Sequence, residues 1–257
     1  MSYHDAHILD QYAYQASVVH RLDPRAKIIA ILFFVIIVVS FPKYVFISLL
    51  PFAIYPLVLA ILSGLSFRLL FRQVLIASPF FILVGLFNPF LDRTMIDVPF
   101  LGIQVRGGII SFASIALRGF LCVSGAVLLV STSSFPRLVE ALQALHLPKA
   151  FTVQLMFLYR YLFLLIEEAK RMSQARLLRS GGFRNSFSSA RSMLSVLLIR
   201  TLHRAGAIWL AMRARGFQDE IKTARKMKWS FKDFIFLALS IIFCLWLRLI
   251  IFEQIKF

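Results

Sequence analysis

Long apolar runs separated by short polar segments occupy most of the chain and predict helices that cross a membrane. A helix needs about 20 residues to span the apolar part of a bilayer. Five runs reach or approach that length, at residues 26–41, 44–62, 73–91, 109–130 and 234–252. The second and third runs contain prolines, which membrane helices tolerate because neighbouring groups satisfy the freed backbone carbonyls.

Polar segments mark where these helices are expected to begin and end. Asp23-Pro24 predicts the start of the first helix, because proline is favoured at the first helical position. Lys27 is expected to extend its charged end toward the membrane surface. A short basic loop is expected at residues 63–72, and a polar loop at residues 92–108, which hold two Asp, two Arg and three Gly.

Residues 131–230 differ from the rest of the chain because they are strongly basic. They contain 17 Lys and Arg but only five Asp and Glu. We expect a short helix over residues 136–145 and two long helices, over residues 149–179 and about 186–215. Ser180-Gly181-Gly182 and Gly216 follow the long helices, and glycine just past a helix end is a common terminator.

Together these segments predict an all-α membrane protein. It has about five transmembrane helices, with a short helix and two long cytoplasmic helices between the fourth and fifth spans. Residues 1–130 form an N-terminal arm and four transmembrane helices, residues 131–230 a cytoplasmic domain, and residues 231–257 the last transmembrane helix.

The distribution of basic residues predicts the orientation of the chain. Residues 150–166 are apolar enough to resemble a span, but a crossing there would place fifteen later Lys and Arg opposite the N-terminal arm. With only the five spans above, 22 of the 29 Lys and Arg lie on one side of the membrane. Cytoplasmic loops carry an excess of Lys and Arg, so this side is expected to be the cytoplasm. The N-terminus is therefore expected inside the cell and the C-terminus outside.

Composition supports a membrane protein and narrows its partners. Apolar residues make up 60% of the chain and charged residues 16%, against about 45–50% and 25% in soluble domains. The formal net charge of +17 favours anionic lipid or an acidic protein as partner, and nucleic acid is not expected for so apolar a chain. Two cysteines, both inside apolar runs, predict no disulfide scaffold.

Motifs for catalysis are missing from the sequence. There is no Gly-Lys dipeptide, so a phosphate-binding loop is absent, and no zinc-binding or nucleophile motif occurs. Proton-coupled transporters usually carry acidic residues or histidine within the membrane, whereas the predicted spans offer Arg118 and Arg248. Arg118 is expected to pair with a polar group or backbone carbonyls inside the bundle. We predict no catalytic residue, no metal site and no cofactor bound by this chain.

The two long helices carry apolar side chains, which in the cytoplasm must pack against another surface. Each helix has about thirty residues, or about 45 Å at 1.5 Å per residue, which is longer than a bundle of short spans requires. One interpretation is an amphipathic hairpin lying on the membrane surface. The other is a docking surface for further subunits, with apolar contacts at Phe151, Leu155, Leu158, Leu162, Leu194 and Leu198.

Three sequence segments resemble a known family. They are His20-Arg-Leu-Asp-Pro-Arg-Ala-Lys27, Leu158-Tyr-Arg-Tyr-Leu-Phe163 with the following Glu167-Glu-Ala-Lys-Arg-Met172, and Ala211-Met-Arg-Ala-Arg-Gly-Phe217. In this order they are similar to the transmembrane T component of energy-coupling-factor (ECF) transporters, in particular to its cobalt-type member CbiQ. The resemblance covers the whole chain, and the third segment is the most specific.

The resemblance implies a scaffold that bridges two ABC-type ATPases and a substrate-binding membrane subunit. Two long coupling helices then each end in a three-residue motif centred on arginine. The second motif is Ala214-Arg215-Gly216, and the first falls at Leu178-Arg179-Ser180. Leu178 departs from the usual alanine, so Ala175-Arg176-Leu177 is the alternative register for the first motif.

The resemblance also implies the remaining partners and the location. The substrate-binding subunit would be CbiM-like, with a small CbiN-like subunit as a further component, and ATP would be used by the ATPases. Cobalt is the expected substrate, followed by nickel and then a vitamin. The chain would lie in the cell membrane of a bacterium or archaeon, in contact with lipid.

Two other function classes compete with the scaffold. A lipid-modifying membrane enzyme would favour paired acids or histidines in the basic segment, which are absent. A self-contained secondary transporter would favour internal repeats with broken helices, and the sequence shows no repeat.

Overall fold

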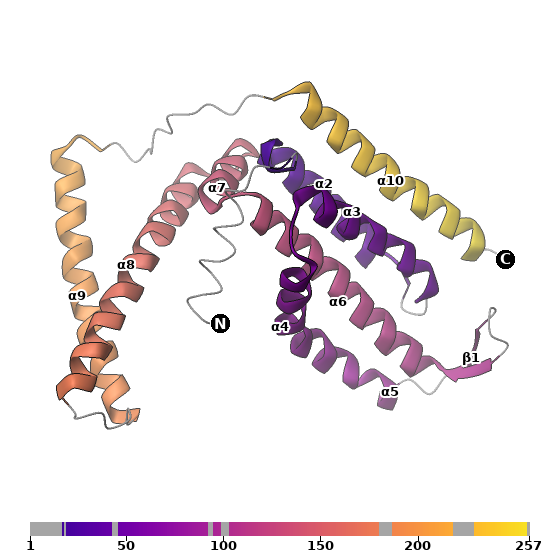
Figure 1. Ribbon diagram of the computed structural model, residues 1–257, viewed down its shortest axis with the longest axis horizontal. Coiled ribbons are helices and arrows are strands. Elements are labelled where there is room, and N and C mark those ends of the chain that lie inside the picture. Colours follow the sequence, from indigo (N-terminus) through magenta and orange to yellow (C-terminus); the bar gives the residue numbers. More distant parts are fainter. Residues whose placement is uncertain are drawn as a thin grey trace. The chain divides into compact units, whose positions relative to one another are not determined.

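The computed structural model describes residues 17, 19–42, 46–91, 95–98, 103–179, 187–217 and 229–255. The chain forms two compact units (Figure 1). Met1–Leu138 and Met227–Phe257 make up the first, called here the membrane unit, and Val139–Lys226 make up the second, called the hairpin unit.

The membrane unit is a bundle of helices around α6, Gly107–Thr132. Helix α6 packs against α2 (Pro24–Val39), the 3-10 helix η2 (Ile47–Ala53), α3 (Ile54–Ser63) and α4 (Phe67–Leu86). Helix α10 (Phe231–Ile255) lies against α2 (Figure 1). The unit also contains four short elements: the 3-10 helix η1 (Val19–Arg21), α5 (Asn88–Leu91) and the strands β1 (Met95–Val98) and β2 (Ile103–Arg106).

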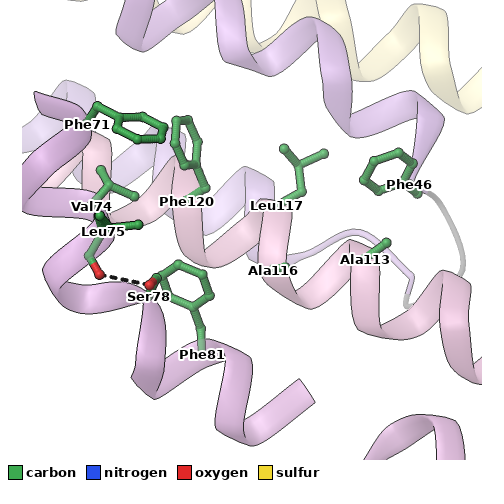
Figure 2. A pocket seen from close by; sticks show the side chains of 10 residues that line it. All are labelled: Phe46, Phe71, Val74, Leu75, Ser78, Phe81, Ala113, Ala116, Leu117 and Phe120. Atoms are coloured by element: carbon green, nitrogen blue, oxygen red, sulfur yellow. Dashed lines mark hydrogen bonds between the residues drawn. The ribbon is translucent and has the colours of Figure 1, made fainter. Parts of the chain in front are cut away.

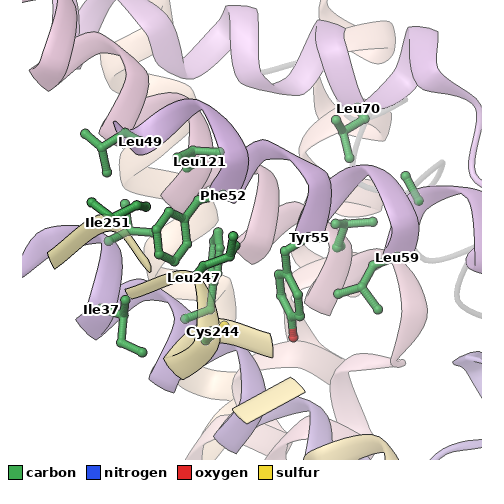
Figure 3. Close-up of a cluster of buried hydrophobic side chains, with 14 of the residues drawn as sticks. Ile37, Leu49, Phe52, Tyr55, Leu59, Leu70, Leu121, Cys244, Leu247 and Ile251 are labelled. Atoms are coloured by element: carbon green, nitrogen blue, oxygen red, sulfur yellow. The ribbon is translucent and has the colours of Figure 1, made fainter. Parts of the chain in front are cut away.

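Aromatic and aliphatic side chains from α2, η2, α3, α4, α6 and α10 form the core of this unit (Figure 3). Phe34 of α2 and Phe52 of η2 are fully buried, and the Phe34 ring stacks on Tyr55 with 4.7 Å between ring centroids. Leu121 of α6 and Cys244 of α10 close the same cluster. The cysteine is therefore a small packing residue, as expected from its apolar neighbours.

Reciprocal contacts between glycine and phenylalanine hold α4 and α6 close together. The Phe81 ring of α4 lies over Gly119 of α6, and the Phe112 ring of α6 lies over Gly85 of α4. Small residues allow such close approach where lipid supplies no hydrophobic driving force between helices.

An apolar hollow of about 400 Å³ lies beside these contacts (Figure 2). Ser78 supplies the only hydroxyl among the described lining residues, and it donates to the Leu75 carbonyl at 2.8 Å. The described side chains of the hollow therefore offer no free hydrogen-bond donor to a polar substrate. Its lining consists of Phe46, Phe71, Val74, Leu75, Ser78, Phe81, Ala113, Ala116, Leu117 and Phe120.

The all-α class is confirmed, with corrections to the membrane unit. The expected basic loop at residues 63–72 is wrong in its second half, because α4 already begins at Phe67 and carries Arg68 and Arg72 on exposed positions. The expected polar loop at residues 92–108 contains an antiparallel strand pair in which Met95 faces Arg106.

Two further corrections concern the first and second runs. The second run divides into η2 and α3, because Pro51 lacks an N–H and removes a helical hydrogen bond. Lys27 does not extend to the surface: its side chain is buried and donates to the carbonyl of Thr132.

Arg118 and Arg248, the two arginines within the spans expected from the sequence, both donate to residues just past the end of α2. Arg118 donates to the Pro42 carbonyl, and Arg248 donates to the Ser40 hydroxyl at 3.3 Å. The expected pairing of Arg118 with a backbone carbonyl is therefore confirmed.

Among the residues that the structure describes, five helices are long and apolar enough to cross a membrane by length and composition alone. They are α4, α6, α8 (Lys149–Arg179), the Arg191–Ala214 part of α9 and α10, and Ile47–Ser63 forms a shorter apolar segment. The chain is thus a multi-pass membrane protein. Apolarity alone does not separate α8 and α9 from the spans, so their assignment depends on charge.

The hairpin unit consists mainly of α8 and α9 (Phe187–Ala214), which lie side by side (Figure 1). A short helix, α7 (Phe135–Ala144), precedes them, and the division between the two units falls within it, after Leu138. The bounds of α8 are those expected from the sequence, and α9 differs from the expected range by one residue at each end.

Candidate functional site

Helices α8 and α9 form an antiparallel pair with a groove between them. An ion pair joins the two helices: Arg200 Nη1 donates to Glu168 Oε1 at 2.7 Å. On one side of this pair, residues 171–179 of α8 face residues 192–196 of α9. On the other side, the start of α8 faces the end of α9 across an apolar hollow of about 800 Å³.

The sequence 211–217 folds into a helix end that presents Arg215. Gly216 adopts a left-handed conformation with φ of 77°, which costs glycine little because it has no Cβ. The Gly216 amide donates to the Arg213 carbonyl, and the Phe217 amide donates to the Met212 carbonyl at 3.1 Å. These two bonds define a Schellman motif, which leaves Arg215 exposed at the end of the helix.

An aromatic contact fixes the direction of this helix end. The Phe217 ring lies 6.2 Å from the Phe157 ring of α8, measured between centroids. The glycine turn therefore serves two purposes: it ends α9, and it returns Phe217 to the neighbouring helix. The turn and the aromatic contact thus fix the backbone at Arg215, two residues before Phe217.

We expect Phe217→Ala to weaken binding of the ATPases that the sequence resemblance implies, without unfolding the chain. The aromatic pair contributes about 0.5–1.5 kcal/mol beyond buried area, so loss of the fixed Arg215 direction should cost roughly twofold to tenfold in affinity. Phe217→Tyr keeps the ring and serves as the control. Titrating purified ATPase against each variant measures the effect, and equal affinities for Phe217→Ala and wild type would contradict it.

Helix α8 ends in a second exposed arginine. Its last turn contains Arg176 and Arg179, as suits the negative end of a helix dipole. Leu178 is 86% exposed and Arg179 is exposed, whereas Arg176 is half-buried. Ser180 lies outside the described residues. Both arginines line the hollow near Glu168. The greater exposure of Arg179 favours it over Arg176 as the residue that contacts a partner, but it does not fix the register of the first arginine motif.

The two arginines lie at opposite ends of the hairpin. In an antiparallel pair the C-terminal end of one helix lies beside the N-terminal end of the other, so Arg179 and Arg215 are separated by the length of α9. That helix has 28 residues, which correspond to about 42 Å. This spacing therefore allows two separate partner proteins to contact one arginine each.

The six expected apolar contact residues lie outside the groove. Phe151, Leu158 and Leu162 of α8 are 64%, 56% and 44% exposed, and Leu155 is half-buried. Leu194 and Leu198 of α9 are also exposed. These residues follow one another at three- or four-residue steps along each helix, so each helix presents a continuous apolar stripe outward. Such stripes need lipid or protein to cover them.

Sequence reasoning missed the groups that hold the hairpin together. Neither Arg200 nor Phe157 was singled out, and Glu168 was named only within the segment Glu167–Met172. The step between Phe157, Tyr161, Leu164 and Glu168 does follow one face of a helix, so periodicity carried the signal. Among the described residues, no group of three His, Cys, Asp or Glu side chains is placed to hold a metal ion.

Comparison with known proteins gives one matching family. The family CbiQ, described as cobalt transport protein, matches residues 15–228.

Curated relatives cover most of the chain. An energy-coupling factor transporter transmembrane protein EcfT from Clostridium kluyveri is 26% identical over 252 residues, covering 88% of this chain and 90% of the relative. An uncharacterized protein from Methanocaldococcus jannaschii is 27% identical over 244 residues, covering 91% and 82%. The cobalt transport protein CbiQ of Salmonella typhimurium is 30% identical over 101 residues, covering 38% and 45%.

Proposed function

The chain belongs to the CbiQ family of cobalt transport proteins, and we propose that it is the transmembrane scaffold of an ECF-type importer. In this role it joins two ABC-type ATPases to a membrane subunit that binds the substrate. It binds no nucleotide itself, and ATP is used by the ATPases. Its curated relatives named EcfT are transmembrane proteins of energy-coupling-factor transporters.

The placement of Arg179 and Arg215 at opposite ends of one hairpin carries this proposal. Each guanidinium is exposed, sits at the C-terminal end of a long helix and offers a planar set of donors to carboxylates or carbonyls. Two ATPases therefore each have one arginine to bind, together with its neighbours Ser180, or Ala214 and Gly216. The roles of these residues and the register at Arg179 are part of the proposal.

Movement of the ATPases then reaches the substrate-binding subunit through the hairpin. When ATP draws the two ATPases together, the movement acts on the two arginine ends and changes the angle between α8 and α9. The groove between the helices has room for this change, because packing is loose where α8 begins and α9 ends. The outward stripe containing Phe151, Leu155, Leu158, Leu162, Leu194 and Leu198 is the proposed contact with the substrate-binding subunit.

The proposed topology places the N-terminus and the hairpin unit in the cytoplasm and the C-terminus outside. The basic residues of α8 and α9 support it, since cytoplasmic segments are enriched in Lys and Arg. Single cysteines at positions 2, 188 and 254 test it with a membrane-impermeant thiol reagent. In intact cells only the cysteine replacing Gln254 should react, and both others should react after lysis. Labelling of position 188 from outside would refute this layout.

Cobalt is the proposed substrate. The proposed substrate-binding subunit is CbiM-like, with a small CbiN-like subunit as a further component of the complex. The family description and the Salmonella relative support cobalt, and nickel or a vitamin are the alternatives. The assembled complex should be purified from its own cells and assayed for bound metals and vitamins. Cobalt retained at close to one ion per complex supports the proposal, and a vitamin in its place would redirect it.

A further inference from the structure

A cluster of buried charged residues lies in the membrane unit, away from the arginine ends. Asp23 is 8%, Lys27 2% and Asp233 3% exposed. Burying a charge is costly unless it is paired and hydrogen-bonded. The lysine and one aspartate belong to the sequence His20–Lys27, to which the transport mechanism above gives no role.

Lys27 binds the end of α6. Its Nζ donates to the Thr132 carbonyl at 2.9 Å and to the Ser133 hydroxyl at 3.1 Å. Thr132 is the last residue of α6, and the last carbonyls of a helix have no partner within the helix. The ammonium group supplies that partner and places a positive charge at the negative end of the helix.

Asp233 binds the starts of two helices at once. Its Oδ1 accepts a hydrogen bond from the Asp23 amide at 2.8 Å, and its Oδ2 accepts one from the Ser230 amide at 2.9 Å. Ser230 immediately precedes α10, so the second bond is one half of a capping box. Asp23 in turn caps α2, because its Oδ1 accepts from the Arg25 amide at 2.9 Å.

These contacts occur where the chain passes between its two units. The chain leaves the membrane unit after Leu138 and returns to it at Met227. Thr132 and Ser133 lie a few residues before the exit, and Ser230 and Asp233 a few residues after the return. Asp23 and Lys27 of α2 therefore bind both connections, and every residue of the cluster belongs to the membrane unit.

We propose that Asp23, Lys27 and Asp233 form a clamp that fixes both chain connections to the membrane unit, and that transport requires this clamp in addition to ATPase binding. The proposal rests on the scaffold function. Movement of the hairpin enters the membrane unit through these two connections. Without the clamp, the last turn of α6 or the first turn of α10 would unwind and absorb the movement. The three residues are thus positioning residues for energy coupling.

Lys27→Met tests the clamp in the complete complex of ATPases, scaffold and substrate-binding subunit. Methionine keeps a long, unbranched side chain but leaves the Thr132 carbonyl without its donor. Lys232→Met makes the same change at an exposed lysine next to Asp233 and is the matched control. Asp233→Asn is the second variant, because its amide cannot accept from both backbone amides. Complexes are reconstituted in liposomes with radioactive cobalt(II) as the probe.

The ratio of cobalt uptake to ATP hydrolysis is the deciding readout. In Lys27→Met and Asp233→Asn we expect ATPase recovery and hydrolysis within about twofold of wild type, and at least a tenfold fall in uptake per ATP. Lys232→Met should keep the wild-type ratio. An unchanged ratio in both clamp variants would overturn the proposal, and so would loss of assembly in both, which would show a role in folding alone. A wild-type complex without ATP-driven uptake would instead refute the scaffold function.

Discussion

Charge reversal at both arginine ends, Arg179→Glu with Arg215→Glu, should abolish transport while leaving the membrane unit folded. Each glutamate would place a negative charge at the negative end of a helix dipole and against any acidic groove on the ATPase. Loss of one hydrogen-bonded charge contact at an interface costs about 2–5 kcal/mol, or at least about thirty-fold in affinity. Both side chains are exposed, so core packing should not change.

Single variants separate the two ends. Arg215→Glu should have the stronger effect, because its motif matches fully and Phe217 holds the helix end in place. Arg176→Glu, one turn before Arg179, is the register control and should be milder than Arg179→Glu. ATPase pull-down and cobalt uptake at matched expression measure the outcome. Normal recovery and uptake in the double variant would contradict the assignment, and a stronger defect at Arg176 would move the first motif by one turn.

Gly119→Ala should destabilise the membrane unit more than its size suggests. A Cβ at this position would lie 2.5 Å from Cγ and 2.9 Å from Cβ of Phe81. These atoms are close to the backbone of α4, so the ring cannot swing away and the helices must separate. Overpacking of this kind costs about 1–3 kcal/mol. Heating the purified protein in detergent and measuring the fraction that stays monodisperse should show a lower midpoint.

Two comparisons make this prediction specific. Gly206→Ala in α9 is the matched control, because nothing lies within 4 Å of the added Cβ, and alanine favours a helix by about 1 kcal/mol. In a Phe81→Ala background the Gly119→Ala change should become neutral or stabilising, since the clash is gone. A destabilisation of equal size in both backgrounds would show that the Phe81 contact is not its cause.

Local sequence signals predicted the helices whose ends are marked by proline, serine or glycine. Helix α8 has the expected bounds because Pro148 precedes it and Ser180-Gly181-Gly182 follows it. Gly216 likewise marked the end of α9. The start of α4 was missed because Arg68 and Arg72 were counted as loop residues, although an exposed arginine is compatible with a helix near a membrane surface.

Contacts between distant residues could not be predicted from these signals. The Phe217 ring meets a residue of the preceding helix, and the Asp23 amide donates to a carboxylate 210 residues away. Neither contact leaves a periodic pattern in the sequence. The Asp-Pro pair did predict the start of α2, but its second use, binding the start of α10, depends on how the helices pack. The four-residue strands β1 and β2 are too short for alternation to distinguish them from a loop.

ATP-driven cobalt uptake in liposomes tests the scaffold function most directly. The chain alone, the ATPases alone and the full complex are compared at equal protein, with ATP supplied on the ATPase side. The scaffold function predicts that the chain alone neither hydrolyses ATP nor accumulates cobalt, and that the full complex does both. Hydrolysis or cobalt accumulation by the pure single chain, or a full complex that takes up cobalt equally well without ATP, would contradict it.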